Sequence, residues 1–113
     1  MLSGMEVAFR TKTLRSLCEN EELMEERFGP EITKALMRRL ADLRASTSLS
    51  DLVLGDPRDV PGTNGRSKTI EIASGHRLVI RANHAKNPTL TDGTTDWRRV
   101  SHVQVMSIEV PHA

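Results

Sequence analysis

Basic side chains gather in one short stretch of this sequence. Residues 65–86 contain a single acid, Glu71, and the following basic residues: Arg66, Lys68, Arg77, Arg81 and Lys86. The whole chain has a formal net charge of only +1, so the positive charge is concentrated here. A polyanion such as nucleic acid is therefore the partner to consider. The competing interpretation is that these side chains only solvate a sheet face or protect its edge from pairing.

Two histidines add groups that titrate near neutrality, His76 within the basic stretch and His112 at the end of the chain. Cleavage of RNA by its own 2′-hydroxyl needs a base, an acid and a cation that stabilises the charge on phosphate. Arginine and histidine on a sheet can supply all three without a metal. Each residue also has a simpler explanation: Arg77 can pair with Glu71 across two strands, His76 can flank a turn, and His112 can be disordered.

Other site chemistries find little support in the sequence. The histidines lack the paired spacings of zinc sites, and the glycines at 62 and 65 are not followed by the Lys-Ser/Thr of a phosphate-binding loop, so we expect neither a metal nor a cofactor. The single cysteine, Cys18, follows Leu14 and Leu17 at helical spacing and is predicted to be a packed thiol. With no tyrosine and few aromatic residues, base-stacking platforms are nearly excluded.

The basic stretch itself predicts a β-hairpin over residues 65–82. β-Branched and apolar residues on both sides are interrupted by Ser74 and Gly75, a pair that can adopt the positive φ of a tight turn. Residues 5–9 alternate as a strand should. Residues 100–110 are also β-prone, with apolar side chains at both odd and even positions, so we predict a central strand that is covered on both faces.

Helical signals fill the region between the first strand and the hairpin. Thr11 can cap a helix that runs to Cys18, and Asn20 can cap a second that runs to Phe28. A longer helix is predicted over residues 30–45, because Pro30 suits a first helical position and this segment carries an apolar stripe made of Ile32, Leu36, Leu40 and Leu43. A further helical turn is expected from Ser48 or Ser50 through Leu54. A loop is expected over residues 56–64 and a long irregular one over residues 83–99.

These elements predict one α+β domain over residues 1–113, with residues 1–4 a disordered or tag-like start. We expect about four strands in the order β-α-α-β-β-β, with the helices packed on one face of a small sheet. At 113 residues the chain is too short for two ordinary domains. No apolar run reaches the roughly 18 residues that span a bilayer, and one cysteine fits a reducing compartment, so we expect a cytoplasmic protein without membrane contact.

Several segments in order resemble one family. Between residues 5 and 112 they are MEVAFRTKTLRSLCEN, EITKALMRRLADLRAS, SLSDLVLG, SGHRLVI, DGTTDWRRV and VQVMSIEV. Together they resemble the RelE/ParE toxin superfamily of bacterial type II toxin–antitoxin modules. The closest resemblance is to its HigB-like branch, whose members are also labelled plasmid maintenance killer or killer suppression proteins. The fold implied is a small sheet with helices on one side.

The resemblance implies a toxin that enters the ribosomal A site and cleaves mRNA there without a metal, an mRNA interferase that inhibits translation. It also implies a cognate helix-turn-helix antitoxin that neutralises the toxin and represses the operon. The family strand Gly-Tyr-Arg-Leu-Val-Phe corresponds to residues 75–80, so Arg77 matches the arginine that holds the scissile phosphate. The family lysine of Leu-Lys-Gly is absent at residues 60–62, and the C-terminal Asp-Tyr-His appears as Val110-Pro111-His112.

Two functional hypotheses follow. In the first, the protein is a ribosome-dependent endoribonuclease in which Arg77 clamps phosphate, His112 or His76 transfers protons, and Arg66, Lys68 and Arg81 position RNA. In the second, it is a binding protein without nuclease activity, either a gyrase-directed inhibitor or a catalytically decayed toxin that still binds its antitoxin. The retained basic hairpin favours the first, and the missing lysine, aspartate and tyrosine favour the second.

Overall fold

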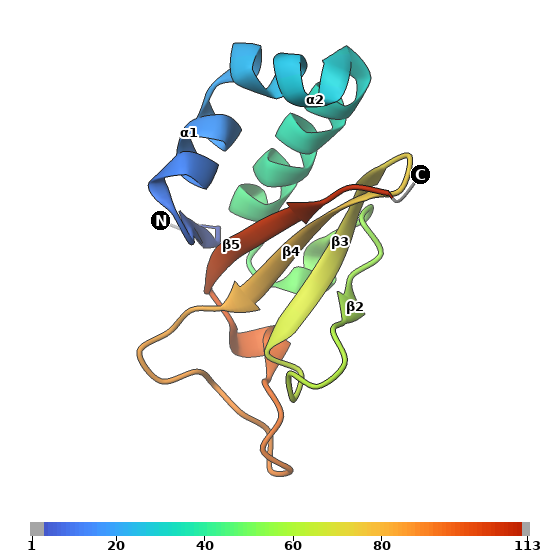
Figure 1. Cartoon of the computed structure of the whole chain (residues 1–113). Coiled ribbons are helices and arrows are strands. Elements are labelled where there is room, and N and C mark those ends of the chain that lie inside the picture. Colours follow the sequence, from blue (N-terminus) through green and yellow to red (C-terminus); the bar gives the residue numbers. More distant parts are fainter. Residues whose placement is uncertain (1–3, 112–113) are drawn as a thin grey trace.

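The computed structural model describes residues 4–111 and contains one five-stranded sheet with helices packed against one face (Figure 1). The strands lie in the order β1-β5-β4-β3-β2. Only β1 and β5 are parallel, and the other neighbouring pairs are antiparallel. Their bounds are Glu6–Phe9 for β1, Arg58–Asp59 for β2, Ser67–Ala73 for β3, His76–Ala82 for β4 and His102–Glu109 for β5. No helix within residues 4–111 is long and apolar enough to cross a membrane.

This architecture confirms the predicted α+β class and all four predicted strands. The fifth strand, β2, is only two residues long and lies in the segment predicted as a loop. It pairs with Lys68 and Thr69 of β3, so the segment that precedes the hairpin contributes a short edge strand to the sheet.

The helices begin where their capping residues predict. Helix α1, Lys12–Glu19, starts after Thr11, whose side chain accepts a hydrogen bond from the backbone N–H of Leu14 at 3.0 Å. Helix α2, Glu21–Ala45, starts after Asn20, which caps it in the same way. Gly29 interrupts α2 with a φ of 83°, so the predicted break before Pro30 is a kink between two helical segments. The expected further turn is the 3₁₀ helix η1, Leu49–Asp51.

The core lies between α2 and the sheet. The predicted stripe of α2 is buried, with Leu36 and Leu43 fully inaccessible to solvent. From the sheet it meets side chains of the central strands, chiefly Ile70, Leu78, Ile80, Val103 and Val105. Burial of these side chains is what fixes α2 against the sheet, because each contributes about 1.5–3 kcal/mol on leaving water.

The hairpin turn has the predicted geometry. Ser74 and Gly75 have φ values of 49° and 81°, and Ala73 pairs with His76 across them. Two consecutive positive φ angles are typical of a type I′ turn, whose twist matches that of the flanking strands.

The prediction for β5 is wrong in one respect. This strand lies inside the sheet, between β1 and β4, but it is not covered on both faces. Val105 pairs with Ile80 and Ser107 with Val79, so Met106 is an extra residue, a β-bulge. The bulge reverses the alternation, which explains why Val103, Val105 and Ile108 all face the helices although their numbers differ in parity.

The long segment after β4 is better ordered than its composition predicts. It forms a loop at the bottom of Figure 1, ends in the 3₁₀ helix η2, Trp97–Arg99, and is anchored by the indole Nε1 of Trp97, which donates to the carbonyl oxygen of Gly65 at 2.5 Å. At the other end of the chain, residues 1–3 of the expected disordered start lie outside the described residues. The fourth, Gly4, packs so closely on the carbonyl of Arg44 that a side chain would not fit.

Candidate nucleic-acid interface

The sheet has one face without helices, which we call the open face. Along β4, Leu78, Ile80 and Ala82 point to the core, and alternation therefore sends Arg77 and Arg81 to the open face. About 13 Å separates their α-carbons along the strand. The two arginines thus present positive charge on a face that no helix within residues 4–111 covers (Figure 1).

Arg77 lies between two carboxylates. Its Nε is 3.9 Å from Oε2 of Glu71 on β3 and 3.7 Å from Oε1 of Glu109 on β5. Pairing with Glu71 was the simpler explanation offered for Arg77, and the structure contains it. Both distances exceed that of a hydrogen bond and all three side chains are about half exposed, so these ion pairs are weak. The guanidinium remains accessible to a phosphate, which would have to compete with the two carboxylates.

Arg81 is more firmly held. Its Nε donates to Oε1 of Gln104, the residue directly opposite on β5, at 2.9 Å. This bond uses one of the five donor hydrogens of the guanidinium and fixes its orientation on the open face. Arg81 can therefore bind a phosphate oxygen with its terminal nitrogens.

The remaining predicted RNA-binding residues do not join this pair. Lys68 shares the face of Ile70 and Ile72, where its Nζ lies 2.7 Å from Asp59 and 5.9 Å from the centre of the Trp97 ring. Arg66 is exposed just before β3, at the end of the hairpin nearest Ala82. The basic side chains of the hairpin therefore point to different surfaces and do not form one cluster.

The predicted proton-transfer groups are also separated from Arg77. His76 is half-buried on the helix side of the sheet, edge-on to Phe28 with ring centres 5.9 Å apart, and its Nδ1 is buried without a hydrogen-bond partner in residues 4–111. His112 lies outside the described residues. The titratable groups that the structure does place beside Arg77 are Glu71 and Glu109, which the sequence analysis did not select as catalytic. Carboxylates can accept a proton, but their charge opposes the approach of phosphate.

A buried arginine of α2 binds the backbone of β3 from the helix side of the sheet. Arg39 of α2 donates from Nε to the carbonyl of Glu71 at 2.9 Å and from Nη2 to that of Ile72 at 3.5 Å, and it pairs with Asp42 at 2.9 Å. β3 is irregular between Glu71 and Ala73, so these carbonyls are not all used by the ladder. Arg39 therefore fixes the backbone from which Glu71 reaches Arg77.

Sequence analysis also missed a group of polar residues at the base of the long loop. Nε2 of His84 accepts hydrogen bonds from the backbone N–H groups of Ser101 at 3.0 Å and His102 at 3.3 Å. Burial, and then the neighbouring His102 ring at 4.9 Å, lowers the pKa of His84 below its ordinary value. The length of the loop was the one signal of a functional segment in the sequence, because these contacts join residues about 17 positions apart.

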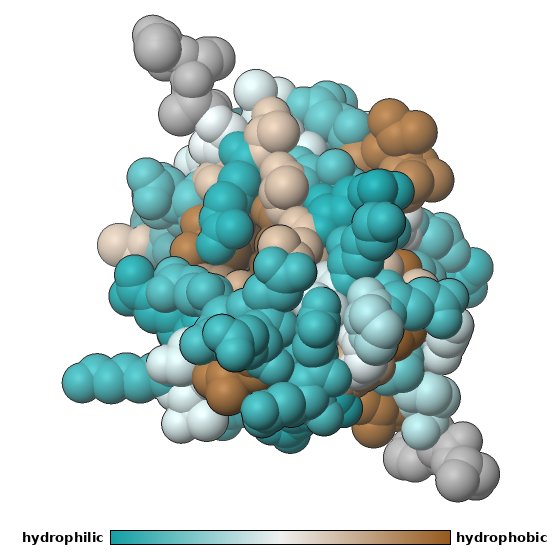
Figure 2. Space-filling view, turned by 90° about the horizontal axis from the view of Figure 1, so that it is seen from above, coloured by the Kyte–Doolittle hydropathy of each residue, from teal (hydrophilic) through white to brown (hydrophobic). Residues whose placement is uncertain are grey.

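The helix side of the molecule carries apolar grooves. One of about 560 Å³ lies between α1 and α2, bordered by Leu17 and the exposed Leu23, and another of about 330 Å³ lies between α1 and the end of β5. Figure 2 looks down on the molecule from above and shows hydrophobic surface exposed among hydrophilic side chains.

Neither metal binding nor thiol chemistry gains support from the described residues. Within residues 4–111 no three His, Cys, Asp or Glu side chains are grouped so as to hold a metal ion. Cys18 is buried, and that burial raises its pKa to about 11, so the thiol is a packing group as predicted.

Comparison with known proteins identifies the fold. No family model matches the chain, and no curated protein sequence does. Among solved structures, the chain is similar to one in the YoeB-YefM complex from Staphylococcus aureus, with a TM-score of 0.56 and 12% identity over 96% of this chain and 98% of that one. This similarity confirms the RelE-like fold that the resemblance implies. It does not test membership in the HigB-like branch, which stays a prediction.

Proposed function

We propose that this protein is the toxin component of a type II toxin–antitoxin module and acts as a ribosome-dependent, metal-independent mRNA endoribonuclease. The observation that carries the proposal is the open face, because the exposed Arg77 and the partly exposed Arg81 on an uncovered sheet can bind two phosphates of RNA. The RelE-like fold supports the same assignment. Arg77 clamps the scissile phosphate and Arg81 positions the strand.

We propose that this chain binds a cognate antitoxin, and the comparison supports this because the similar chain was solved in a complex, YoeB-YefM. The helix-turn-helix type of the antitoxin is what the family resemblance implies. The apolar grooves beside α1 offer the exposed hydrophobic surface that such an interface needs. Ribosome, mRNA and antitoxin are thus the three proposed partners.

One observation favours the second hypothesis, a binding protein without nuclease activity. Arg77 is flanked by two carboxylates, and His76 points to the opposite face of the sheet. Under this hypothesis the protein is a gyrase-directed inhibitor or a decayed toxin that retains only antitoxin binding. Both hypotheses use the same fold and differ in whether RNA is cut.

The deciding experiment is cleavage of a defined mRNA by the purified protein, with and without programmed ribosomes. Arg77→Ala is compared with Arg15→Ala, a matched control, because Arg15 is an exposed arginine of α1 on the helix side. Cuts that require ribosomes, vanish in Arg77→Ala and persist in Arg15→Ala are expected. A folded protein that arrests growth without cutting RNA would instead support the non-nuclease inhibitor, and one that does neither would support the decayed toxin.

A further inference from the structure

A pocket of about 540 Å³ lies at the base of the long loop, away from Arg77. Its walls are formed by His84, Lys86, Asn87, Pro88, Thr89 and Arg99. Among these lining residues, all within the described part of the chain, none carries a carboxylate. The hydrogen bonds of the structure determine what each polar side chain presents to the pocket.

The hydrogen bonds of His84 determine which ring nitrogen carries the proton. Its Nε2 accepts from two backbone N–H groups, which can only donate, so the ring proton is on Nδ1. Asn87 is fixed in the same way, because its Oδ1 accepts from the backbone N–H of His84 at 2.9 Å. The amide NH₂ of Asn87 is not used in that bond and can donate to a ligand. Burial and the neighbouring His102 lower the pKa of His84, which favours the neutral ring that these two bonds require.

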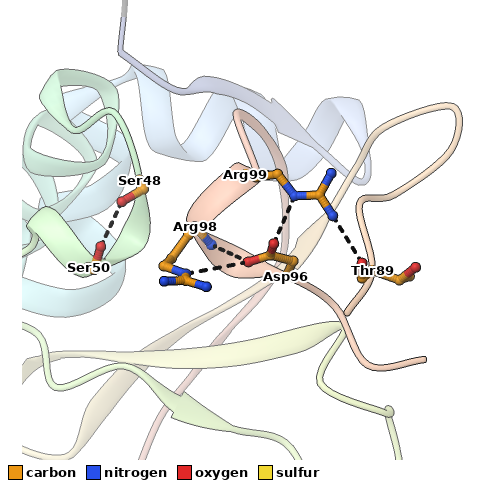
Figure 3. Close-up of polar contacts among 6 residues, drawn as sticks. All are labelled: Ser48, Ser50, Thr89, Asp96, Arg98 and Arg99. Carbon is orange, nitrogen blue, oxygen red and sulfur yellow. Dashed lines mark hydrogen bonds and ion pairs between the residues drawn. The ribbon is translucent and has the colours of Figure 1, made fainter. Parts of the chain in front are cut away.

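Arg99 contributes a positive charge whose guanidinium is oriented by two hydrogen bonds. Its Nε donates to Asp96 at 2.8 Å and its Nη2 to the carbonyl of Thr89 at 2.9 Å, which leaves Nη1 available (Figure 3). The side chain of Asp96 is only 11% exposed, and the hydrogen bond from Arg99 lowers its pKa, so this carboxylate stays ionised. Asp96 is also 3.9 Å from Nε of Arg98, so this one carboxylate faces two arginines and the group keeps an excess of positive charge.

We propose that this pocket binds a backbone phosphodiester of the RNA that occupies the open face. A phosphodiester carries a negative charge and two non-bridging oxygens that accept hydrogen bonds, which suits a pocket with neutral donors and an excess of positive charge. The inference rests on the proposed function for the identity of the ligand, but the pocket itself does not depend on it.

The position of the pocket supports a single RNA strand reaching both sites. His102 precedes Gln104 by two residues on β5, so alternation places it on the open face with Arg81. Its ring touches the ring of His84, which lines the pocket. The open face therefore continues from Arg77 past Arg81 and His102 to the loop.

The test uses Asn87→Asp, which keeps Oδ1 as the acceptor for the backbone N–H of His84 but replaces the NH₂ with a carboxylate oxygen. Asn20→Asp is the matched control, because Oδ1 of Asn20 also accepts a backbone N–H, at the distant start of α2. Backbone and histidine resonances of the full chain are followed by NMR during titration with dimethyl phosphate at constant ionic strength. Saturable shifts at residues 84–87 and 99 are expected, with at least about tenfold weaker binding in Asn87→Asp and none of that loss in Asn20→Asp.

A second arm measures binding of a single-stranded RNA oligonucleotide over a range of salt concentrations. Asn87→Asp should weaken RNA binding and reduce the slope of log K against log salt by about 0.7, the value for one lost phosphate contact. If Arg81→Gln weakens RNA binding and Asn87→Asp does not, the pocket proposal is overturned while the proposed function stands. If dimethyl phosphate shifts the pocket but RNA does not bind, the proposed function fails instead. Absence of saturable shifts overturns the pocket directly.

Discussion

The two carboxylates beside Arg77 should restrain its binding to RNA. If Arg77 clamps phosphate, replacing both neighbours by Glu71→Gln and Glu109→Gln should strengthen RNA binding, since the guanidinium no longer has to be shared. Glutamine keeps the size of each side chain and removes only its charge. The same change removes two ion pairs from the folded protein, so binding and stability should move in opposite directions.

The magnitude follows from the geometry. At 3.7 and 3.9 Å, each pair is worth about 1 kcal/mol at the dielectric constant of water. The side chains are about half exposed, so screening and side-chain entropy reduce each pair to about 0.5 kcal/mol. Together they oppose phosphate binding by about 1 kcal/mol, which corresponds to about a fivefold tighter Kd in the double variant. The free energy of unfolding should fall by no more than the same amount.

Fluorescence anisotropy with a labelled single-stranded RNA at low salt measures the effect. Removing any negative charge favours a polyanion, so Glu22→Gln, at the exposed start of α2, is the control for a general change of charge. The double change is also made in Arg77→Ala, as a double-mutant cycle. Without Arg77, most of the fivefold gain should disappear.

Two results would refute this argument. Unchanged or weaker RNA binding in the Glu71→Gln and Glu109→Gln protein would mean that Arg77 does not meet phosphate. An equal gain in the Arg77→Ala background would mean that the carboxylates repel RNA directly and that Arg77 is not the group they restrain.

Three further predictions concern stability and reactivity. Arg39→Met should lower the free energy of unfolding in urea by about 2–3 kcal/mol, because one buried and one part-buried carbonyl lose their donor. Arg38→Met, on the exposed side of α2, should change it by less than about 0.5 kcal/mol. Folding lowers the pKa of His84 from 6.5, so the unfolded chain binds protons more readily than the folded one. The stability that neutral His84 contributes is therefore present above about pH 6.5 and is lost as the pH falls below it. In urea unfolding, His84→Gln should lose less stability on acidification than the unchanged protein. Cys18, with its pKa near 11, should react with iodoacetamide at neutral pH far more slowly in the native protein than in urea, and equal rates would contradict its burial.

Much of the fold could be predicted because its signals are local. Thr11, Asn20 and Gly29 determine the starts and the break of the helices through their own side chains or backbone angles. The turn at Ser74 and Gly75 follows in the same way from residues that tolerate positive φ. Strand β2 was missed because two residues in a loop have no periodicity, and only pairing with β3 makes them a strand.

The candidate site was harder to predict, because its geometry depends on which face each side chain takes. Counting basic residues treated Lys68 and Arg77 as one cluster, although alternation from the apolar Ile70 and Ile72 already places Lys68 on the helix side. Its contact with Trp97 joins residues 29 positions apart and has no local signal. The pocket of the long loop has no local signal either, because the tautomer of His84 is fixed by hydrogen bonds that its ring accepts from Ser101 and His102, at the start of β5.

The bulge at Met106 connects register to electrostatics. In a regular strand continued from Val105, Ser107 would pair with Leu78 and Ile108 with Arg77, so Ile108 would face the open side and Glu109 the helices. The extra residue instead pairs Ile108 with Leu78 in the core and Glu109 with Arg77. One residue of register therefore completes the core and also gives Arg77 its second carboxylate. A search for catalytic residue types does not detect such an effect, because Glu109 acquires its role only from a change of alternation three positions earlier.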